Sequence, residues 1–274
     1  MEQQRWELRP VGVVRSPIAD PRAMPVNGVP ASVEVFPEFA PALTQIDSNT
    51  HVWVITWLHA ADRTTLQTRG RHARPGGVER GVFSLRHASR PNPLGLMAAR
   101  LLRVEGRHLY LDRLDFVDGT PVVDLKRYSP GWDAIFAART YYETLPRDDP
   151  PEQIAADLYL EAVHFLGEPC VEAALAARLL THIMAAWAIP AKDPALRIGV
   201  APTRLADALQ AVSGATLGSG RLHVTAGTAV QFQHGWQCAE VHPRPQLPLE
   251  PEAVLGAPES ALFGVRYSTL ADTV

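Results

Sequence analysis

The residues best suited to chemistry gather in the stretch 81–95. It reads Gly-Val-Phe-Ser-Leu-Arg-His-Ala-Ser-Arg-Pro-Asn-Pro-Leu-Gly, so a short apolar run leads into polar side chains. Pro91 and Pro93 fix two φ angles and remove two backbone donors, which ends any strand or helix there. The guanidiniums of Arg86 and Arg90 beside this stiff turn suit a ligand that carries a carboxylate or another anion. The alternative is a solvated loop at the end of a hairpin, and this stretch alone favours that alternative.

A second stretch, residues 115–128, places three carboxylates on a turn followed by a strand. The Asp-Gly pair at 118–119 is typical of a tight turn, and the apolar run after Pro121 predicts a strand. A carboxylate in such a turn can accept a proton from a reacting group. It can equally cap the turn or pair with the basic residues that follow. The three candidates are Asp115, Asp118 and Asp124.

Together these stretches resemble the TrmO (YaeB-like) family of S-adenosylmethionine-dependent tRNA methyltransferases. Members carry a Gly-Val-Phe-Ala-Thr-Arg…Arg-Pro-Asn-Pro-Ile-Gly element and then Asp-Gly-Thr-Pro…Asp-Ile-Lys-Pro-Tyr, which match residues 81–95 and 118–128. The resemblance covers residues 10–135, roughly half of the chain. It implies the fold and cofactor of that family, and methylation of the exocyclic amine of threonylcarbamoyladenosine in tRNA.

The resemblance also implies individual site residues. The positions that would bind S-adenosylmethionine are Pro25, Val26, Asn27, His59, Ala60, Arg86, Leu96, Val117, Asp118, Gly119 and Thr120. The catalytic candidates are Asp118 and Asp115, and the substrate candidates are Arg69, Arg71, Arg90, Asn92, Lys126 and Tyr128. Arg86 would bind the cofactor carboxylate, and the loop at 25–27 would close over it. The chain has Pro-Val-Asn at 25–27 where the family usually has Pro-Arg-Gln, and Lys-Arg-Tyr at 126–128 where Lys-Pro-Tyr is usual.

The first half of the chain shows strand patterns at short, regular intervals. They lie at 11–14, 31–36, 51–59, 81–85, 96–104, 108–114 and 121–125. This spacing predicts an antiparallel β-barrel or sandwich rather than βαβ units. The run at 51–59 is nearly continuous in β-branched and aromatic residues, so we expect a strand covered on both faces. No Gly-x-Gly-x-x-Gly element follows a strand and opens a helix, so a Rossmann-type site is not supported.

The second half changes character after a polar, proline-rich linker at 145–152. Helices are predicted at 153–166, 171–188 and 203–212, with a strand at 197–200 and a hairpin formed by 222–224 and 229–232. The expected fold class is therefore α+β. We expect a cofactor-binding β-barrel at 8–144, a helix-rich α+β domain at 153–241, and a proline-rich tail at 242–274.

The run 206–222 is similar to part of the FmdE-like domains, which usually bind a metal through cysteines. Here Ala215 stands at one expected cysteine, and the His-Gly-His-x-Cys-Pro-Gly element would fall on residues 166–170, which read Leu-Gly-Glu-Pro-Cys. Cys170 would keep only Glu168 or His164 as partners. Because one thiolate rarely suffices for zinc, we expect no metal.

Composition limits the remaining possibilities. The chain has 274 residues, 46% hydrophobic and 20% charged, as expected of a soluble globular protein. No apolar run reaches the roughly 18 residues of a membrane span, the first residues lack the apolar core of a signal peptide, and the two cysteines form no Cys-x-x-Cys pair. A cytoplasmic protein is therefore expected. Residues 1–150 carry 19 Lys and Arg against 17 Asp and Glu, whereas the remainder has a net charge of −5.

An arginine cluster at 63–107 could neutralise RNA phosphates, or arginine could simply replace lysine on the surface. Three functions stay open: a tRNA methyltransferase, a methyltransferase of a small metabolite whose pocket the second domain shapes, and a non-catalytic S-adenosylmethionine-binding protein. A homodimer is expected, because the loops of a small barrel form only part of a site and the proline-rich tail has no obvious core to join.

Overall fold

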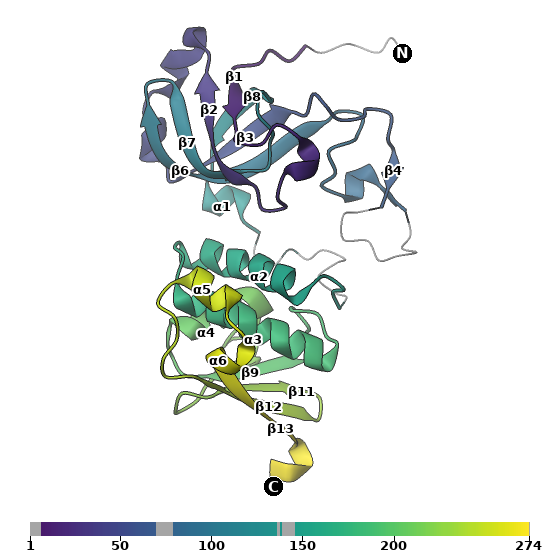
Figure 1. Ribbon diagram of the computed structural model, residues 1–274, viewed down its shortest axis with the longest axis vertical. Coiled ribbons are helices and arrows are strands. Elements are labelled where there is room, and N and C mark those ends of the chain that lie inside the picture. The colour runs from purple at the N-terminus through teal and green to yellow at the C-terminus, as the bar shows by residue number, and fades with distance from the viewer. Residues whose placement is uncertain (1–6, 70–78, 136–137, 139–145, 274) are drawn as a thin grey trace. The chain divides into compact units, whose positions relative to one another are not determined.

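The computed structural model describes residues 7–69, 79–135, 138 and 146–273 (Figure 1). The chain divides into two compact units, Met1–Phe136 and Ala137–Val274. The first unit consists mainly of strands, and the second combines helices with a sheet. The predicted α+β class is therefore confirmed.

The first unit is a closed barrel whose strands run in the order β1-β2-β7-β6-β3-β8, with every neighbouring pair antiparallel. The predicted barrel is confirmed. Its strands are β1 (Gly12–Arg15), β2 (Val29–Val35), β3 (His51–Trp57), β6 (Leu94–Glu105), β7 (His108–Leu114) and β8 (Pro121–Arg127). Around it lie the 3-10 helices η1 (Pro21–Ala23), η2 (Pro37–Leu43) and η3 (Ile46–Ser48), and the short helix α1 (Pro130–Asp133).

Strand β3 shows how the sequence builds this barrel. Its side chains alternate, so that Val52, Val54 and Thr56 are fully buried while His51 and Trp53 remain partly exposed. The prediction that this strand is covered on both faces is wrong. A closed barrel has a single interior, so the outward side chains of even its most apolar strand face away from the core.

The predicted strand at 81–85 is also wrong for most of its length. Only two residue pairs form, between β4 (Gln67–Thr68) and β5 (Arg80–Gly81), and the chain then turns into the 3-10 helix η4 (Val82–Ser84). Ser84 Oγ donates to the carbonyl of Gly81 at 2.8 Å, and the N–H of Leu85 donates to the carbonyl of Val82. These local hydrogen bonds compete with sheet pairing.

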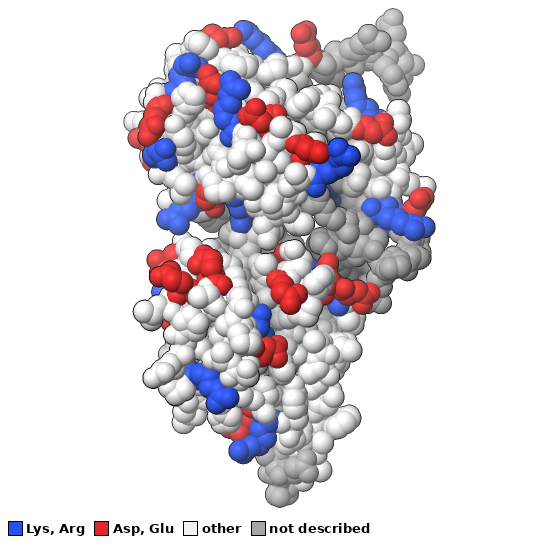
Figure 2. Space-filling model, viewed as in Figure 1, with Lys and Arg blue, Asp and Glu red and all other residues white. Residues whose placement is uncertain are grey.

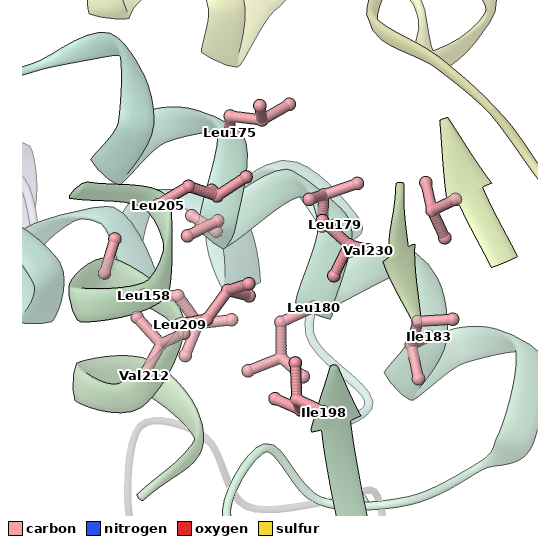
Figure 3. Packing of buried hydrophobic residues seen from close by; sticks show 14 of the residues in the cluster. Leu158, Leu175, Leu179, Leu180, Ile183, Ile198, Leu205, Leu209, Val212 and Val230 are labelled. Carbon is pink, nitrogen blue, oxygen red and sulfur yellow. The ribbon is translucent and has the colours of Figure 1, made fainter. Parts of the chain in front are cut away.

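In the second unit, helices cover one face of a five-stranded sheet of order β10-β9-β11-β12-β13 (Figure 1). The long helices are α2 (Pro151–Leu166), α3 (Val171–Trp187) and α4 (Arg204–Ser213), and the first four strands are β9 (Leu196–Val200), β10 (Leu222–Val224), β11 (Val230–His234) and β12 (Gln237–Pro243). The core brings Leu158, Leu180 and Leu209 of the three helices against Ile198 and Val230 of the sheet (Figure 3). None of the helices among the described residues is long and apolar enough to cross a bilayer.

The predicted hairpin of 222–224 with 229–232 does not form. Strand β9 lies between the two segments, pairing in parallel with β10 and antiparallel with β11. Leu196, Ile198 and Val200 are buried, so this apolar strand takes an interior position and separates two strands that follow each other in sequence.

Residues 242–274 were expected to be a separate tail. The structure instead folds part of them into α5 (Pro251–Gly256), α6 (Glu259–Leu262) and β13 (Phe263–Thr269), which pairs with β12 at the edge of the sheet. Two polar residues of the largely apolar α3, Arg178 and His182, hold this segment. Arg178 donates to the carbonyls of Leu255 and Ala257, both at 2.9 Å, and His182 lies 2.9 Å from Glu259 Oε2 and 2.7 Å from Tyr267 Oη.

Candidate functional site

One end of the barrel collects the segments that carry the two sequence motifs. Strands β1, β3 and β7 end there, and β2, β6 and β8 begin there, as the pairs Val29–Leu114, Trp57–Leu94 and Val13–Pro121 show. We call this end the motif end. The segments predicted to bind the cofactor all belong to it: residues 25–27 precede β2, His59 and Ala60 follow β3, Leu96 lies near the start of β6, and residues 117–120 join β7 to β8.

The turn at 117–120 is fixed to β1 by backbone hydrogen bonds. The N–H of Gly119 donates to the carbonyl of Val14 at 3.0 Å, and that of Asp118 donates to the carbonyl of Ile18 at 2.7 Å. Gly119 has φ +76°, and a Cβ placed there would meet no atom within 4 Å, so the turn presents an open backbone surface. Thr120 is buried and its hydroxyl donates to the carbonyl of Val117 at 2.7 Å.

Asp118 has a structural partner that the sequence analysis did not anticipate. Its Oδ1 accepts a hydrogen bond from the N–H of Ser16 at 3.1 Å, which ties the turn to the loop after β1. Asp115, the other catalytic candidate, is exposed at the end of β7. No local signal predicts the contact between Ser16 and Asp118, because 102 residues separate the two partners.

The loop at 25–27 lies against the end of β7. The N–H of Gly28 closes a turn onto the carbonyl of Pro25 at 3.0 Å, and Gly28 has φ +74°. A Cβ on Gly28 would lie 2.6 Å from the carbonyl carbon and oxygen of Leu114, so only glycine allows this approach. The loop therefore stands beside Asp115, as expected of a segment that closes over a site at this end.

Arg86 reaches from the loop after η4 to strand β6, where its Nη2 donates to the carbonyl of Leu96. This bond joins two of the predicted cofactor residues and holds an exposed positive charge at the motif end. Arg90 acts differently, because its Nη2 donates to the carbonyls of Val82 and Leu85 within its own loop. Arg90, a predicted substrate residue, therefore braces the loop that carries Arg86.

Beneath these loops the barrel interior is closed by a tight contact. Gly95 pairs with Thr56, and a Cβ on Gly95 would lie 2.3 Å from Thr56 Oγ1 and 2.6 Å from Phe116 Cε1. Phe116 is only 5% exposed and directly precedes the turn at 117–120. Thr56 Oγ1 is buried and has no hydrogen-bond partner among the described residues. The sequence suggests that Gly95 allows a close approach of the backbone, but it does not identify Thr56 and Phe116 as the packing partners.

The loop after β3 is anchored by Asp62. Its carboxylate accepts hydrogen bonds from the hydroxyls of Thr64 at 2.9 Å and Thr65 at 2.5 Å, and from the N–H of Thr64. The hydrogen bond from Thr65, followed by those from Thr64, lowers the pKa of Asp62 to about 2. The carboxylate therefore stays ionised, and it fixes the chain just after the two predicted cofactor residues His59 and Ala60.

The predicted substrate residues are not all at the motif end. Asn92 is exposed beside Arg90, and Arg69 is exposed at the end of the first described range, whereas Arg71 lies outside the described residues. Lys126 and Tyr128 lie at the opposite end of β8. This strand has seven residues, so about 20 Å separate its two ends.

The site chemistry fits a zwitterionic cofactor such as S-adenosylmethionine. Arg86 offers a guanidinium for a carboxylate, and the open turn at 117–120 offers backbone groups for polar edges. The described residues contain no group of three His, Cys, Asp or Glu side chains that could hold a metal ion. In the second unit, Glu168 pairs with Arg204 at 2.9 Å, and burial raises the pKa of the Cys170 thiol.

Comparison with known proteins agrees with this geometry. The family model described as the tRNA-methyltransferase O N-terminal domain matches residues 13–134, which span the barrel. A protein of Archaeoglobus fulgidus named "S-adenosyl-L-methionine-binding protein" is 39% identical over 133 residues, which cover 47% of this chain and 93% of that protein. The tRNA (adenine(37)-N6)-methyltransferase of Mus musculus is 37% identical over 93 residues, which cover 34% of this chain and 22% of that protein.

A further relative reaches beyond the barrel. A second Archaeoglobus fulgidus protein, named "Probable S-adenosyl-L-methionine-binding protein", is 34% identical over 227 residues. The match covers 79% of this chain but only 60% of that protein, so the chain spans less than two thirds of its length. Because the barrel unit makes up half of the chain, a match of this extent includes much of the second unit. The chain belongs to the TrmO family of S-adenosylmethionine-dependent methyltransferases.

Proposed function

We propose that this protein methylates the exocyclic amine of threonylcarbamoyladenosine in tRNA. The observation that carries the proposal is the meeting, at one end of the barrel, of the 25–27 loop, the Arg86 loop and the 117–120 turn. The similarity to a mouse enzyme named as a tRNA methyltransferase supports tRNA as the acceptor. Such a substrate also supports the expectation of a cytoplasmic protein.

When bound, S-adenosylmethionine supplies a methyl group on a positively charged sulfur. The acceptor nitrogen forms a bond to the methyl carbon while the carbon–sulfur bond breaks, the sulfur keeps the electron pair, and the nitrogen loses a proton. The protein mainly has to align donor and acceptor, and positioning of this kind supplies much of the rate. We assign Arg86 to the cofactor carboxylate and the turn at 117–120 to its polar edges.

The two catalytic candidates take different roles in this proposal. Asp118 holds the turn through its hydrogen bond from Ser16, so we assign it to positioning of the cofactor. Asp115 is exposed beside the loop at 25–27, so we assign it to accepting the proton from the acceptor nitrogen.

The test is calorimetry with S-adenosylmethionine together with transfer of a labelled methyl group to bulk tRNA. Arg86→Ala removes a charge-assisted contact, so we expect cofactor affinity to fall by roughly 1.5–3 kcal/mol, with partial recovery in Arg86→Lys. Arg22→Ala is the matched control, because Arg22 is exposed in η1, just before the loop at 25–27, and among the described residues its guanidinium bonds to Asp20. Equal cofactor affinity of Arg86→Ala and Arg22→Ala would remove this assignment.

A small metabolite is the second candidate acceptor. Residues 151–274 have a net charge of −5, and Figure 2 shows acidic side chains gathered over the helices of the second unit. This charge repels RNA and favours a small acceptor bound by that unit. Methyl transfer to a small-molecule extract but not to tRNA would favour this candidate. Cofactor binding without transfer to either would identify a non-catalytic binding protein.

We also propose a homodimer. Large apolar side chains are exposed around the motif end, namely Val26, Phe83, Leu94 and Leu96, and exposed apolar groups of this kind mark association surfaces. Leu96 belongs to the predicted cofactor site, so a second copy on this surface would help to enclose the cofactor. Light scattering at micromolar concentration tests the proposal, and a monomeric mass would contradict it.

A further inference from the structure

The outer wall of the barrel carries aromatic and basic side chains together, away from the motif end. His51 and Trp53 face outward on β3, since they alternate with the buried Val52 and Val54. Arg100 of β6 pairs across from His51, and Lys126 of β8 pairs across from Trp53. Tyr128 follows β8 and completes the group. We call these five residues the aromatic–basic patch.

The three rings of the patch form one cluster. The ring centroids of Trp53 and Tyr128 are 5.4 Å apart with an interplanar angle of 54°, and those of His51 and Tyr128 are 6.3 Å apart at 57°. All three side chains are partly exposed, so part of each ring is open to a ligand. Burial lowers the pKa of His51, which favours the neutral imidazole at pH 7.

The patch also carries two cationic side chains, those of Arg100 and Lys126. Arg100 is exposed, and its guanidinium makes no hydrogen bond or ion pair within the described part of the chain. The backbone N–H of Arg100 donates to Asp112 Oδ1. Lys126 is exposed too and pairs with Asp124 at 2.7 Å, a surface contact that holds its ammonium only weakly. Two cations beside three clustered, partly exposed rings match the chemistry of unpaired RNA, whose phosphates bind cations and whose bases stack on aromatic rings.

We infer that the aromatic–basic patch binds unpaired nucleotides of the RNA substrate next to the nucleotide that is methylated. The inference rests on the proposed function and extends it to residues outside the motif end. From Trp57, at the motif end of β3, to Trp53 the strand covers four residues, or about 13 Å. This separation suits a loop that places one base at the motif end while neighbouring nucleotides follow the wall.

The structural alternative is that the cluster only stabilises the pairing of β3 with β8. The barrel provides a matched control for this alternative. Arg103 of β6 lies over the ring of Tyr110 of β7, with its Cζ 3.6 Å from the ring centroid. Arg103 and Tyr110 combine an arginine with a tyrosine, as Arg100 and Tyr128 do in the patch, but they lie on a different part of the barrel wall.

The experiment measures binding of two RNA probes, a short hairpin with an unpaired loop and the same stem as a closed duplex, at two salt concentrations. Trp53→Leu and Tyr128→Leu should weaken hairpin binding about tenfold each, because each removes a stacking surface. Arg100→Gln and Lys126→Gln should each lower the slope of log affinity against log salt by about 0.7. Arg103→Gln and Tyr110→Leu should leave hairpin binding unchanged.

Three results would overturn the inference. The first is that Trp53→Leu and Tyr128→Leu weaken binding of the hairpin and of the duplex equally. The second is that Arg100→Gln and Lys126→Gln bind the hairpin like the wild type, and the third is a changed oligomeric mass of Trp53→Leu, which would assign the patch to a second copy of the chain. Calorimetry with S-adenosylmethionine tests the patch separately from the cofactor site, because variants of the aromatic–basic patch should bind the cofactor with the affinity of the wild type. Wild-type protein that binds the hairpin but methylates no RNA would refute the proposed function alone.

Discussion

The contact under Gly95 gives a prediction whose size follows from the structure. A Cβ added there would lie 2.3 Å from Thr56 Oγ1, 2.6 Å from Phe116 Cε1 and 3.0 Å from Leu58 Cδ2. All three neighbours are side chains in or beside the barrel core, so the interior must shift. Overpacking of this kind costs about 1–3 kcal/mol, and we expect Gly95→Ala to lower the free energy of unfolding of the barrel by that amount.

Displacement of Phe116 should also shift the turn at 117–120, which belongs to the proposed cofactor site. Phe116 directly precedes the turn at 117–120, so Gly95→Ala should weaken S-adenosylmethionine binding although the new methyl group lies in the barrel interior. The assay is urea unfolding for stability and calorimetry for the cofactor. Gly81→Ala is the control, because Gly81 has φ −61° and a Cβ there would meet nothing within 4 Å.

A second substitution in the Gly95→Ala protein tests whether the contact with Thr56 causes the loss of stability. Adding Thr56→Ala to Gly95→Ala removes the closest contact and also a buried hydroxyl that has no hydrogen-bond partner among the described residues, so part of the stability should return. Gly95→Ala that unfolds like Gly81→Ala and binds the cofactor normally would refute the reasoning. A double variant less stable than Gly95→Ala alone would show that Thr56 does not cause the strain.

Three further predictions concern single side chains. Arg178→Ala removes two hydrogen bonds to carbonyls at the C-terminal end of α5, those of Leu255 and Ala257, so urea unfolding of the second unit should show a loss of roughly 2–4 kcal/mol, and unchanged unfolding would contradict it. Tyr159 has a buried hydroxyl without a partner among the described residues, so Tyr159→Phe should leave stability unchanged or raise it by up to about 1 kcal/mol; a clear loss would contradict this. Burial lowers the pKa of His51 below 6.5, so the unfolded chain takes up the proton first, and stability should fall as pH drops from 6.5 through the folded pKa. His51→Gln should flatten this dependence, and an unchanged pH curve would exclude His51 as its cause.

Much of the barrel could be predicted from sequence because its pattern is local. Alternation in 31–36 predicts a half-buried strand, and the apolar runs at 51–59 and 108–114 also predict strands; each forms in the structure. The nearly continuous run at 51–59 does not reveal that only one face of β3 is buried. The pairing in the second unit could not be predicted in this way. The position of β9 between β10 and β11 depends on how the strands pack together under the three helices, and that is a property of the whole core.

In the candidate site, too, the sequence predicts features with a local pattern and misses those that depend on contacts between distant segments. Motif residues such as Arg86 and Gly119 are recognisable because their types and spacing are specific to a family. Contacts that position them, such as the hydrogen bond from Ser16 to Asp118, join segments distant in sequence and leave no local pattern. Lys126 and Tyr128 lie at the opposite end of the barrel because β8 is seven residues long. The motif alone does not reveal the length of this strand.

The position of β13 at the edge of the second sheet bears on how the chain folds during synthesis. The barrel is complete once β8 ends at Arg127, whereas the sheet of the second unit lacks its last strand until Thr269 has been made. At about 5–20 residues per second, roughly 7–28 s separate these two moments. Val254, Leu262 and Phe263 belong to the core around α3, so the apolar surface of α3 stays partly uncovered from the synthesis of that helix until these residues have been added. The nascent second unit should therefore depend on chaperones far more than the barrel does.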